Sequence, residues 1–390
     1  MKQPFKTRIQ KVLSALRATK TSSALLVSSS PFAPRSRDTF HPYRQNSDFF
    51  YLTGSLEPNQ HLLLSTEEEH PLLYTEPVNP AKVVWDGAPA SPKPLASSLG
   101  AKLETVSHIP SHIKKKLSGI NALYYQSESD PKIFRMINGL FELPSHQRQN
   151  FPTSFHHVDV ILEPMRVIKS QHEIAEMKRA AEVTWESLKQ TAQIVGAGLR
   201  EHEVVASLEY HIRLFGCEPS FSTIVATGVS AATLHYQAHT RKLKKGELLL
   251  IDFGAEYNMY AADVTRMLPV SRTFSGVLAE LYDCVLEAQM KSIAAVRDGV
   301  TIQKVYNAAA NILIEGLKDF GVLRGSTSSL LEKRAHLPYF PHGIGHGLGL
   351  DVHDVGKLRG TNKPLLRSGM VFTIEPGLYF PKPVGKLPAC

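Results

Sequence analysis

An apolar run that contains an acidic residue constrains the fold of this chain more than any other feature. Residues 248–254 read Leu-Leu-Leu-Ile-Asp-Phe-Gly, which predicts a strand with Asp252 near its end. A carboxylate in such a strand is costly to bury unless it is paired or binds a metal. Asp263 follows eleven residues later in a second strand-like run, 261–268, after a predicted turn at 256–258. Each aspartate alone is also typical of a turn or an edge, but together they predict two carboxylates on one face of a sheet.

A histidine cluster lies farther along the chain. Residues 341–354 hold His342, His346 and His353 among four glycines. A lone histidine is more often a core residue, but a cluster with small neighbours indicates ligands or acid–base groups that need close access. Glu375, before a Pro-Gly turn, adds a carboxylate that looks buried. Two aspartates, one histidine and one glutamate suit Mn²⁺, Co²⁺ or Zn²⁺, in a pair rather than singly, and predict a metal-dependent hydrolase.

The length and the pattern of elements predict two domains. A chain of 390 residues is too long for one ordinary domain, and Pro144, Pro152 and polar residues interrupt the pattern over 144–158. We expect a smaller α/β domain over 1–155. Residues 165–390 combine helices with a mostly antiparallel sheet, so the fold class expected is α+β.

Individual elements follow from the periodicity. Ser170 and Glu173 form a predicted capping box that starts a long helix. The other helices are predicted over 204–215, 277–296 and 301–320. The remaining strands are predicted over 24–27, 49–52, 61–64, 72–74, 221–227, 346–353 and 370–379.

Composition excludes several classes of protein. No run approaches the roughly 18 apolar residues of a membrane span. The net charge of +8 comes from scattered Lys and Arg, which favours a solvated surface over nucleic-acid binding. Three cysteines fit a reducing cytoplasm. The basic N-terminus is also compatible with an organellar transit peptide, but its apolar face, which includes Phe5 and Leu16, favours a first helix.

These motifs, in this order, resemble those of the pita-bread metallopeptidase family (M24), and in particular its Xaa-Pro aminopeptidase (aminopeptidase P) branch. Residues 35–38, Arg-Ser-Arg-Asp, and 41–54, His-Pro-Tyr-Arg-Gln-Asn-Ser-Asp-Phe-Phe-Tyr-Leu-Thr-Gly, resemble the N-terminal domain of that branch. The resemblance implies a C-terminal pita-bread (creatinase/aminopeptidase-like) domain. It also implies an enzyme that removes the first residue from peptides with proline second.

The resemblance implies two divalent metal ions, with Mn²⁺ favoured. Asp252 resembles the carboxylate that chelates one ion, and Asp263 the carboxylate that bridges both. His346 and Glu375 resemble ligands of the other ion, and Glu375 is also implied as a proton shuttle.

The resemblance also implies a substrate site. His235 resembles a histidine that lines it, and His342 and His353 resemble two that hold the substrate and the reaction intermediate. Asp38 and Tyr379 occupy positions that border the substrate pocket in the family.

The chain departs from the family at its C-terminal end. The family's fifth ligand, a second glutamate in a later strand, is expected beyond Cys390, so a domain without its last strands and helix is predicted. Three readings therefore stay open: an Xaa-Pro aminopeptidase, a prolidase acting on Xaa-Pro dipeptides, and a non-catalytic binding protein of this fold. The resemblance implies a proline-containing peptide as partner, and allows a homo-oligomer, either a dimer or a tetramer.

Overall fold

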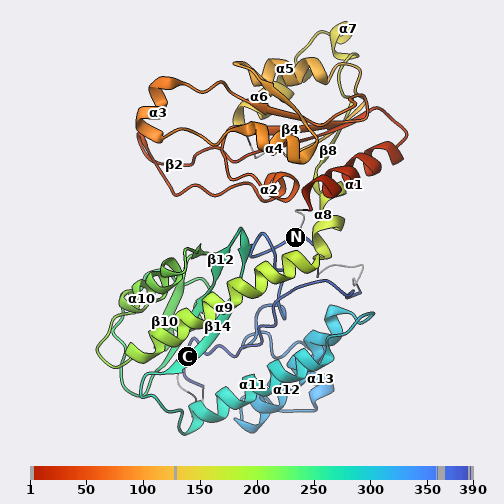
Figure 1. Ribbon diagram of the computed structural model, residues 1–390. Coiled ribbons are helices and arrows are strands. Elements are labelled where there is room, and N and C mark those ends of the chain that lie inside the picture. Colours follow the sequence, from red (N-terminus) through yellow and green to blue (C-terminus); the bar gives the residue numbers. More distant parts are fainter. Residues whose placement is uncertain (1–3, 127–129, 357, 359–364, 385–386, 388–390) are drawn as a thin grey trace. The chain divides into compact units, whose positions relative to one another are not determined.

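The computed structural model describes residues 4–126, 130–356, 358, 365–384 and 387 (Figure 1). Its contacts divide the chain into two compact units, Met1–Met165 and Arg166–Cys390. The prediction that the domain lacks its last strands and helix concerns the C-terminal end, where residues 385–386 and 388–390 lie outside the described residues.

Unit 1 contains a mixed six-stranded sheet in the order β6-β5-β4-β1-β7-β8. The central strand β1 pairs antiparallel with β4 and parallel with β7. Its apolar side chains are buried on both faces, which is why β1 reads as a continuous apolar run. The strands of the sheet are β1 (Ser23–Ser28), β4 (Gln60–Ser65), β5 (Leu72–Thr75), β6 (Lys102–Thr105), β7 (Ala122–Tyr125) and β8 (Ser154–His157). A separate hairpin joins β2 (Pro34–Ser36) and β3 (Thr39–Phe40).

Helices connect the strands of unit 1, and one of them corrects a predicted strand. The run 49–52 is not a strand but part of α2 (Ser47–Thr53), which Asn46 caps and Gly54 ends at φ 69°. Nearly every residue of α2 is buried, so its sequence lacks the polar face that marks a surface helix. The other helices are α1 (Phe5–Ala18), α3 (Pro80–Asp86), α4 (Pro92–Leu99), α5 (Ile109–Lys116), α6 (Pro131–Phe141), α7 (Ser145–Arg148) and α8 (Asp159–Val167), which ends in unit 2.

The sheet that matters for function lies in unit 2. The strands β10 (Ile224–Thr227), β11 (Leu248–Phe253) and β14 (Val264–Pro269) form an antiparallel sheet with β11 in the middle. Burial alternates along β11: Leu249, Ile251 and Phe253 are fully buried, whereas Asp252 is only partly buried. Because successive side chains of a strand point to opposite faces, Asp252 lies on the face away from the apolar core.

Two pairs of helices pack in two apolar cores of unit 2. The capping box is confirmed: α9 (Gln171–Ile194) begins with reciprocal hydrogen bonds between Ser170 and Glu173. Both α9 and α10 (Glu201–Leu214) pack with β11 in one apolar core. A second core joins α11 (Val277–Ala295) and α12 (Ile302–Asp319) to residues between 340 and 378. The remaining elements are β9 (Glu218–Pro219), the 3₁₀-helix Gly228–Ala232, β12 (Ala255–Tyr257), β13 (Tyr260–Ala261) and α13 (Thr327–Glu332).

Three predictions for unit 2 were wrong in detail. The turn after β11 lies at Asn258 and Met259, both at positive φ, rather than at 256–258. The segments 346–353 and 370–379 are not strands; an isolated bridge joins Gly347 to Phe372. The glycines of the histidine cluster allow close backbone contacts in place of a regular ladder.

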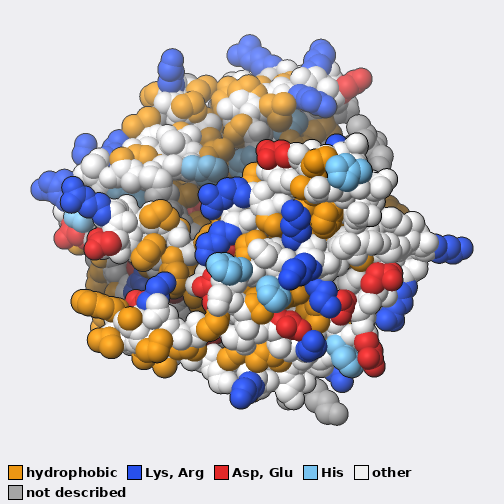
Figure 2. All heavy atoms as spheres, turned by 90° about the horizontal axis from the view of Figure 1, so that it is seen from above, with side chains coloured by type: hydrophobic (Ala, Val, Ile, Leu, Met, Phe, Trp, Pro, Cys, Tyr) orange, Lys and Arg blue, Asp and Glu red, His pale blue; other side chains and the backbone are white. Residues whose placement is uncertain are grey.

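Two global features accompany this fold. On the face shown in Figure 2, Lys and Arg side chains are scattered among acidic, apolar and polar neighbours rather than gathered in one patch. Among the described residues, the helices are all too short or too polar to cross a membrane.

Candidate metal centre

A close approach of two backbones places Asp263 at the site. A Cβ atom at Gly254 would lie 1.8 Å from the carbonyl oxygen of Ala262, so only glycine fits there. The hydroxyl of Ser220 donates to the same carbonyl at 2.7 Å. Asp252 pairs with Thr265 across β11 and β14, and Asp263 stands two residues before Thr265, so alternation along the chain places it on the same face as Asp252.

A second close approach aligns His346 with Glu375. A Cβ atom at Gly345 would lie 2.0 Å from the carbonyl oxygen of Thr373. The His346 N–H donates to Thr373 Oγ1 at 3.0 Å, and the Thr373 N–H donates to the His346 carbonyl at 2.9 Å. The Glu375 N–H donates to the carbonyl of Ile344 at 2.7 Å. These bonds hold the two predicted ligands side by side without a regular strand.

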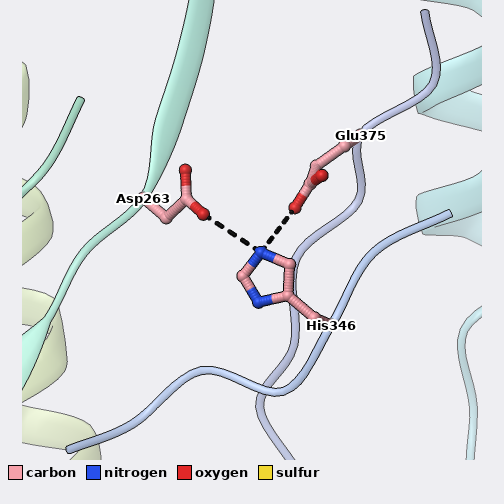
Figure 3. A group of neighbouring side chains, drawn as sticks. All are labelled: Asp263, His346 and Glu375. Carbon is pink, nitrogen blue, oxygen red and sulfur yellow. Dashed lines mark ion pairs between the residues drawn. The ribbon is translucent and has the colours of Figure 1, made fainter. Parts of the chain in front are cut away.

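Three of the predicted ligands meet at one imidazole nitrogen (Figure 3). His346 Nε2 lies 3.2 Å from Asp263 Oδ2 and 3.1 Å from Glu375 Oε1. One ligand atom from each residue lies within 4.8 Å of the others, close enough to hold one ion. His346 Nδ1 donates to the carbonyl of Gly347 at 3.0 Å, which leaves Nε2 as the ligand atom once its proton is lost.

The charges of the cluster are strongly coupled. Burial alone would lower the pKa of His346, but hydrogen bonds to Asp263 and Glu375 raise it to about 10. Burial alone would raise the pKa of Glu375, but hydrogen bonds from His346 and Thr373 hold it below its usual range. In the metal-free chain, the protonated ring of His346 therefore supplies the positive charge between the two carboxylates that a metal ion would supply.

Asp252 lies beside this group but outside the set of three. Burial, together with the charge of Asp263, raises the pKa of Asp252 to about 7. Its Oδ1 is buried without a hydrogen-bond partner among the described residues. A buried carboxylate oxygen with no donor, beside two further carboxylates and one imidazole, fits a divalent cation. The residues present are thus suited to a metal.

His342 and Tyr379 form a hydrogen-bonded pair. His342 Nδ1 donates to the carbonyl of Gly343 at 2.8 Å, so Nε2 of the neutral ring accepts from the Tyr379 hydroxyl at 2.9 Å. Burial and the charges of Glu375 and Asp252 raise the pKa of Tyr379 far above its usual value. The phenol therefore keeps its proton and acts as a donor.

The structure places His353 and His235 differently. The ring of His353 lies 4.1 Å from that of His346, centroid to centroid, so it borders the cluster. Burial lowers the pKa of His353, and charge on His346 and His235 lowers it further. His235 is exposed, in the segment after the 3₁₀-helix. In unit 1, Asp38 is exposed in the turn between β2 and β3.

The segment that carries His235 is anchored by a residue that the sequence did not indicate. Glu201, the first residue of α10, is fully buried. Its carboxylate accepts from the Thr227 N–H at 2.9 Å, and from the Tyr236 hydroxyl and the Arg241 N–H at 3.0 Å each. These three donors flank His235 on both sides along the chain.

Replacing Glu201 by alanine is expected to lower the free energy of unfolding by about 3 kcal/mol, because one buried and two partly buried donors lose a buried, charged acceptor. Denaturant unfolding of the purified chain measures the loss. The exposed Glu182, on α9, provides the control, and Glu182→Ala should change stability by less than about 0.5 kcal/mol. A loss below about 1 kcal/mol for Glu201→Ala would contradict this role.

Thr373 is a second residue that the sequence analysis did not assign. It stands two positions before Glu375, and alternate residues of an extended segment share a face. This spacing of two residues is the sequence signal that could have identified Thr373 as a neighbour of the site.

Comparison with known proteins defines the class to which this fold and site belong. The model of metallopeptidase family M24 matches residues 175–387, and that of the aminopeptidase P N-terminal domain matches residues 5–124. The chain is therefore a metallopeptidase by class.

Individual relatives agree over nearly the whole chain. Xaa-Pro aminopeptidase of Escherichia coli (strain K12) is 33% identical over 386 residues, which cover 97% of this chain and 87% of that protein. A structure of aminopeptidase P from E. coli superposes with a TM-score of 0.90 at 33% identity, covering 97% of this chain and 88% of that one. Aminopeptidase PepP of Pseudomonas aeruginosa gives 0.89 at 32% identity, with 97% and 88% covered.

This chain belongs to metallopeptidase family M24, and within it resembles the Xaa-Pro aminopeptidases throughout. The predicted fold class is confirmed: an N-terminal domain of the aminopeptidase P type precedes a pita-bread domain.

Proposed function

We propose that this chain is a metal-dependent exopeptidase that removes the N-terminal residue from peptides with proline in the second position. The observation that carries the proposal is the convergence of Asp263, His346 and Glu375 on one point, with Asp252 beside them. The names of the relatives, Xaa-Pro aminopeptidase and aminopeptidase P, support the substrate class.

We propose that these four side chains hold two divalent ions, with Mn²⁺ favoured because the set is rich in oxygen ligands. A structure of zinc-substituted E. coli aminopeptidase P shows that a relative accepts zinc. When bound, such ions supply a Lewis acid for the peptide carbonyl and an activated water at neutral pH. The few cysteines of the chain support a cytoplasmic location.

The chain's own residues supply proton transfer and positioning. The pKa of Glu375 is lowered, so its carboxylate is ionised at neutral pH and can accept a proton from the attacking water. Tyr379 keeps its proton and donates a hydrogen bond to His342 Nε2, and so orients that imidazole. His353 and His235 complete the group of imidazoles that would hold the substrate, and Asp38 stays a predicted substrate residue.

The test is hydrolysis of an Xaa-Pro-Xaa tripeptide by the purified chain, with Mn²⁺ and after chelation. We expect release of the first residue with Mn²⁺ only, and little release from Xaa-Ala-Xaa. An Xaa-Pro dipeptide separates this activity from that of a prolidase. A folded, Mn²⁺-loaded chain that releases nothing from the tripeptide would overturn the proposal.

A further inference from the structure

A buried ion cluster joins the start of unit 2 to the segment that carries His353. The Arg166 guanidinium lies 2.7 Å from Asp351 Oδ2 and 2.6 Å from Asp354 Oδ1, and Lys169 Nζ lies 2.8 Å from Asp354 Oδ2. The side chains of Arg166, Lys169 and Asp354 are 4%, 2% and 2% exposed, whereas Asp351 is 39% exposed. Asp354 is thus held by two cations, away from solvent.

The backbone and the carboxylate of Asp354 also hold the conformation of residues 347–354. The Asp354 N–H donates to the carbonyl of Gly347 at 2.9 Å, and the Gly349 N–H donates to that of Asp351 at 3.1 Å. A Cβ atom at Gly349 would lie 2.2 Å from Asp354 Oδ2 and 3.0 Å from the side chain of Lys169. The glycine therefore makes room for the carboxylate and its cation.

The two histidines of this segment are held by different contacts. His346 is fixed by its backbone bonds to Thr373. His353 directly precedes Asp354 in the chain, so its position depends on where that carboxylate is held.

We propose that Arg166 and Lys169 are positioning residues, which hold His353 at the metal centre through Asp354. A buried ion pair is a weak source of stability compared with apolar packing, but it defines one geometry. One guanidinium nitrogen of Arg166, Nη2, contacts both aspartates. The planar guanidinium presents this nitrogen in a fixed orientation, whereas a lysine ammonium sits on a flexible stem. The inference rests on the proposed function, because His353 is taken to contact the peptide substrate.

A double-mutant cycle tests the proposal. Arg166→Lys keeps the charge but loses the planar guanidinium, and should lower kcat/KM for the Xaa-Pro-Xaa tripeptide about 10-fold, the low end of what loss of a supporting partner typically costs. The dissociation constant of Mn²⁺, from calorimetry, should change less than about 3-fold. In a His353→Ala background, the same substitution should lower kcat/KM less than about 2-fold, because its target is already gone. Glu182→Gln, in an exposed ion pair of α9, is the control and should change nothing.

Equal losses in both backgrounds, or a parallel loss of Mn²⁺ affinity, would overturn the proposal, since either means that the cluster acts on the fold or on His346. Should Arg166→Lys fail to fold, Asp351→Asn changes the partly exposed partner, while Arg166 keeps its contact with Asp354. It should lower kcat/KM about 3-fold, again only while His353 is present.

The cluster can also be tested if the unmodified chain cleaves no peptide, an outcome that would refute the proposed function alone. Hydrogen exchange should then show that the amides of Gly349 and Asp354 lose protection in Arg166→Lys while that of Thr373 keeps it. Unchanged protection at Gly349 and Asp354 would overturn the positioning role.

Discussion

Replacing Asp263 by asparagine is expected to abolish metal-dependent hydrolysis. The substitution keeps the shape of the side chain but removes the charge that faces His346 Nε2 at 3.2 Å. Loss of a partner behind a ligand typically costs about 10–100-fold in metal affinity or activity, and loss of a ligand should cost more. We therefore expect Mn²⁺ affinity and kcat/KM to fall by more than about 100-fold each.

Calorimetric Mn²⁺ titration and tripeptide cleavage measure the two effects. Asp283, exposed on α11 in the same unit, provides the matched control, and Asp283→Asn should behave as the unmodified chain does. If Asp263→Asn retains Mn²⁺ affinity within about 10-fold, the three-residue cluster is not the metal centre.

Metal affinity is expected to rise steeply with pH. In the metal-free chain, the pKa of His346 is about 10 and that of Asp252 about 7. Both groups must lose a proton to become ligands, so binding releases protons and is favoured as pH rises. Near pH 6 both are protonated, and the dissociation constant of Mn²⁺ should fall roughly 100-fold per pH unit. Above pH 7 only His346 still holds its proton, and the fall should slow to about 10-fold per unit.

Titrations in two buffers of different ionisation enthalpy count the protons directly. We expect about two released per chain near pH 6 and about one near pH 8. In His346→Ala, the count near pH 8 should drop to near zero. Binding that is independent of pH, with no proton release, would show that these two groups are not ligands.

Local sequence signals were reliable where the deciding contacts are local. The capping box at Ser170 needs only four consecutive residues, and it is formed. The apolar run around Asp252 is a strand because alternate side chains bury against α9 and α10. By contrast, residues 49–52 were predicted as a strand because the all-round burial that makes α2 apolar is set by the rest of unit 1.

The motifs and their resemblance to a family indicated Asp263, His346 and Glu375, which lie together in the structure, but not what holds them there. The anchors Glu201 and Arg166 carried no local signal. Arg166 meets Asp351 and Asp354 across 185 and 188 residues of chain, and such pairing follows only from the packed fold.

By itself, the sequence indicated the family through its motifs. It also determined the capping box of α9, the strand around Asp252 and the chemical types of the candidate ligands, because capping, strand alternation and side-chain chemistry act over a few neighbouring residues. The tertiary structure alone decided the geometry. At Gly254 and Gly345 the missing side chain lets a second backbone approach closely, that of Ala262 and that of Thr373 respectively. These contacts help to place Asp263 and Glu375 beside His346. The pKa values followed from the same step, because burial and the nearness of other charges exist only once the chain has folded.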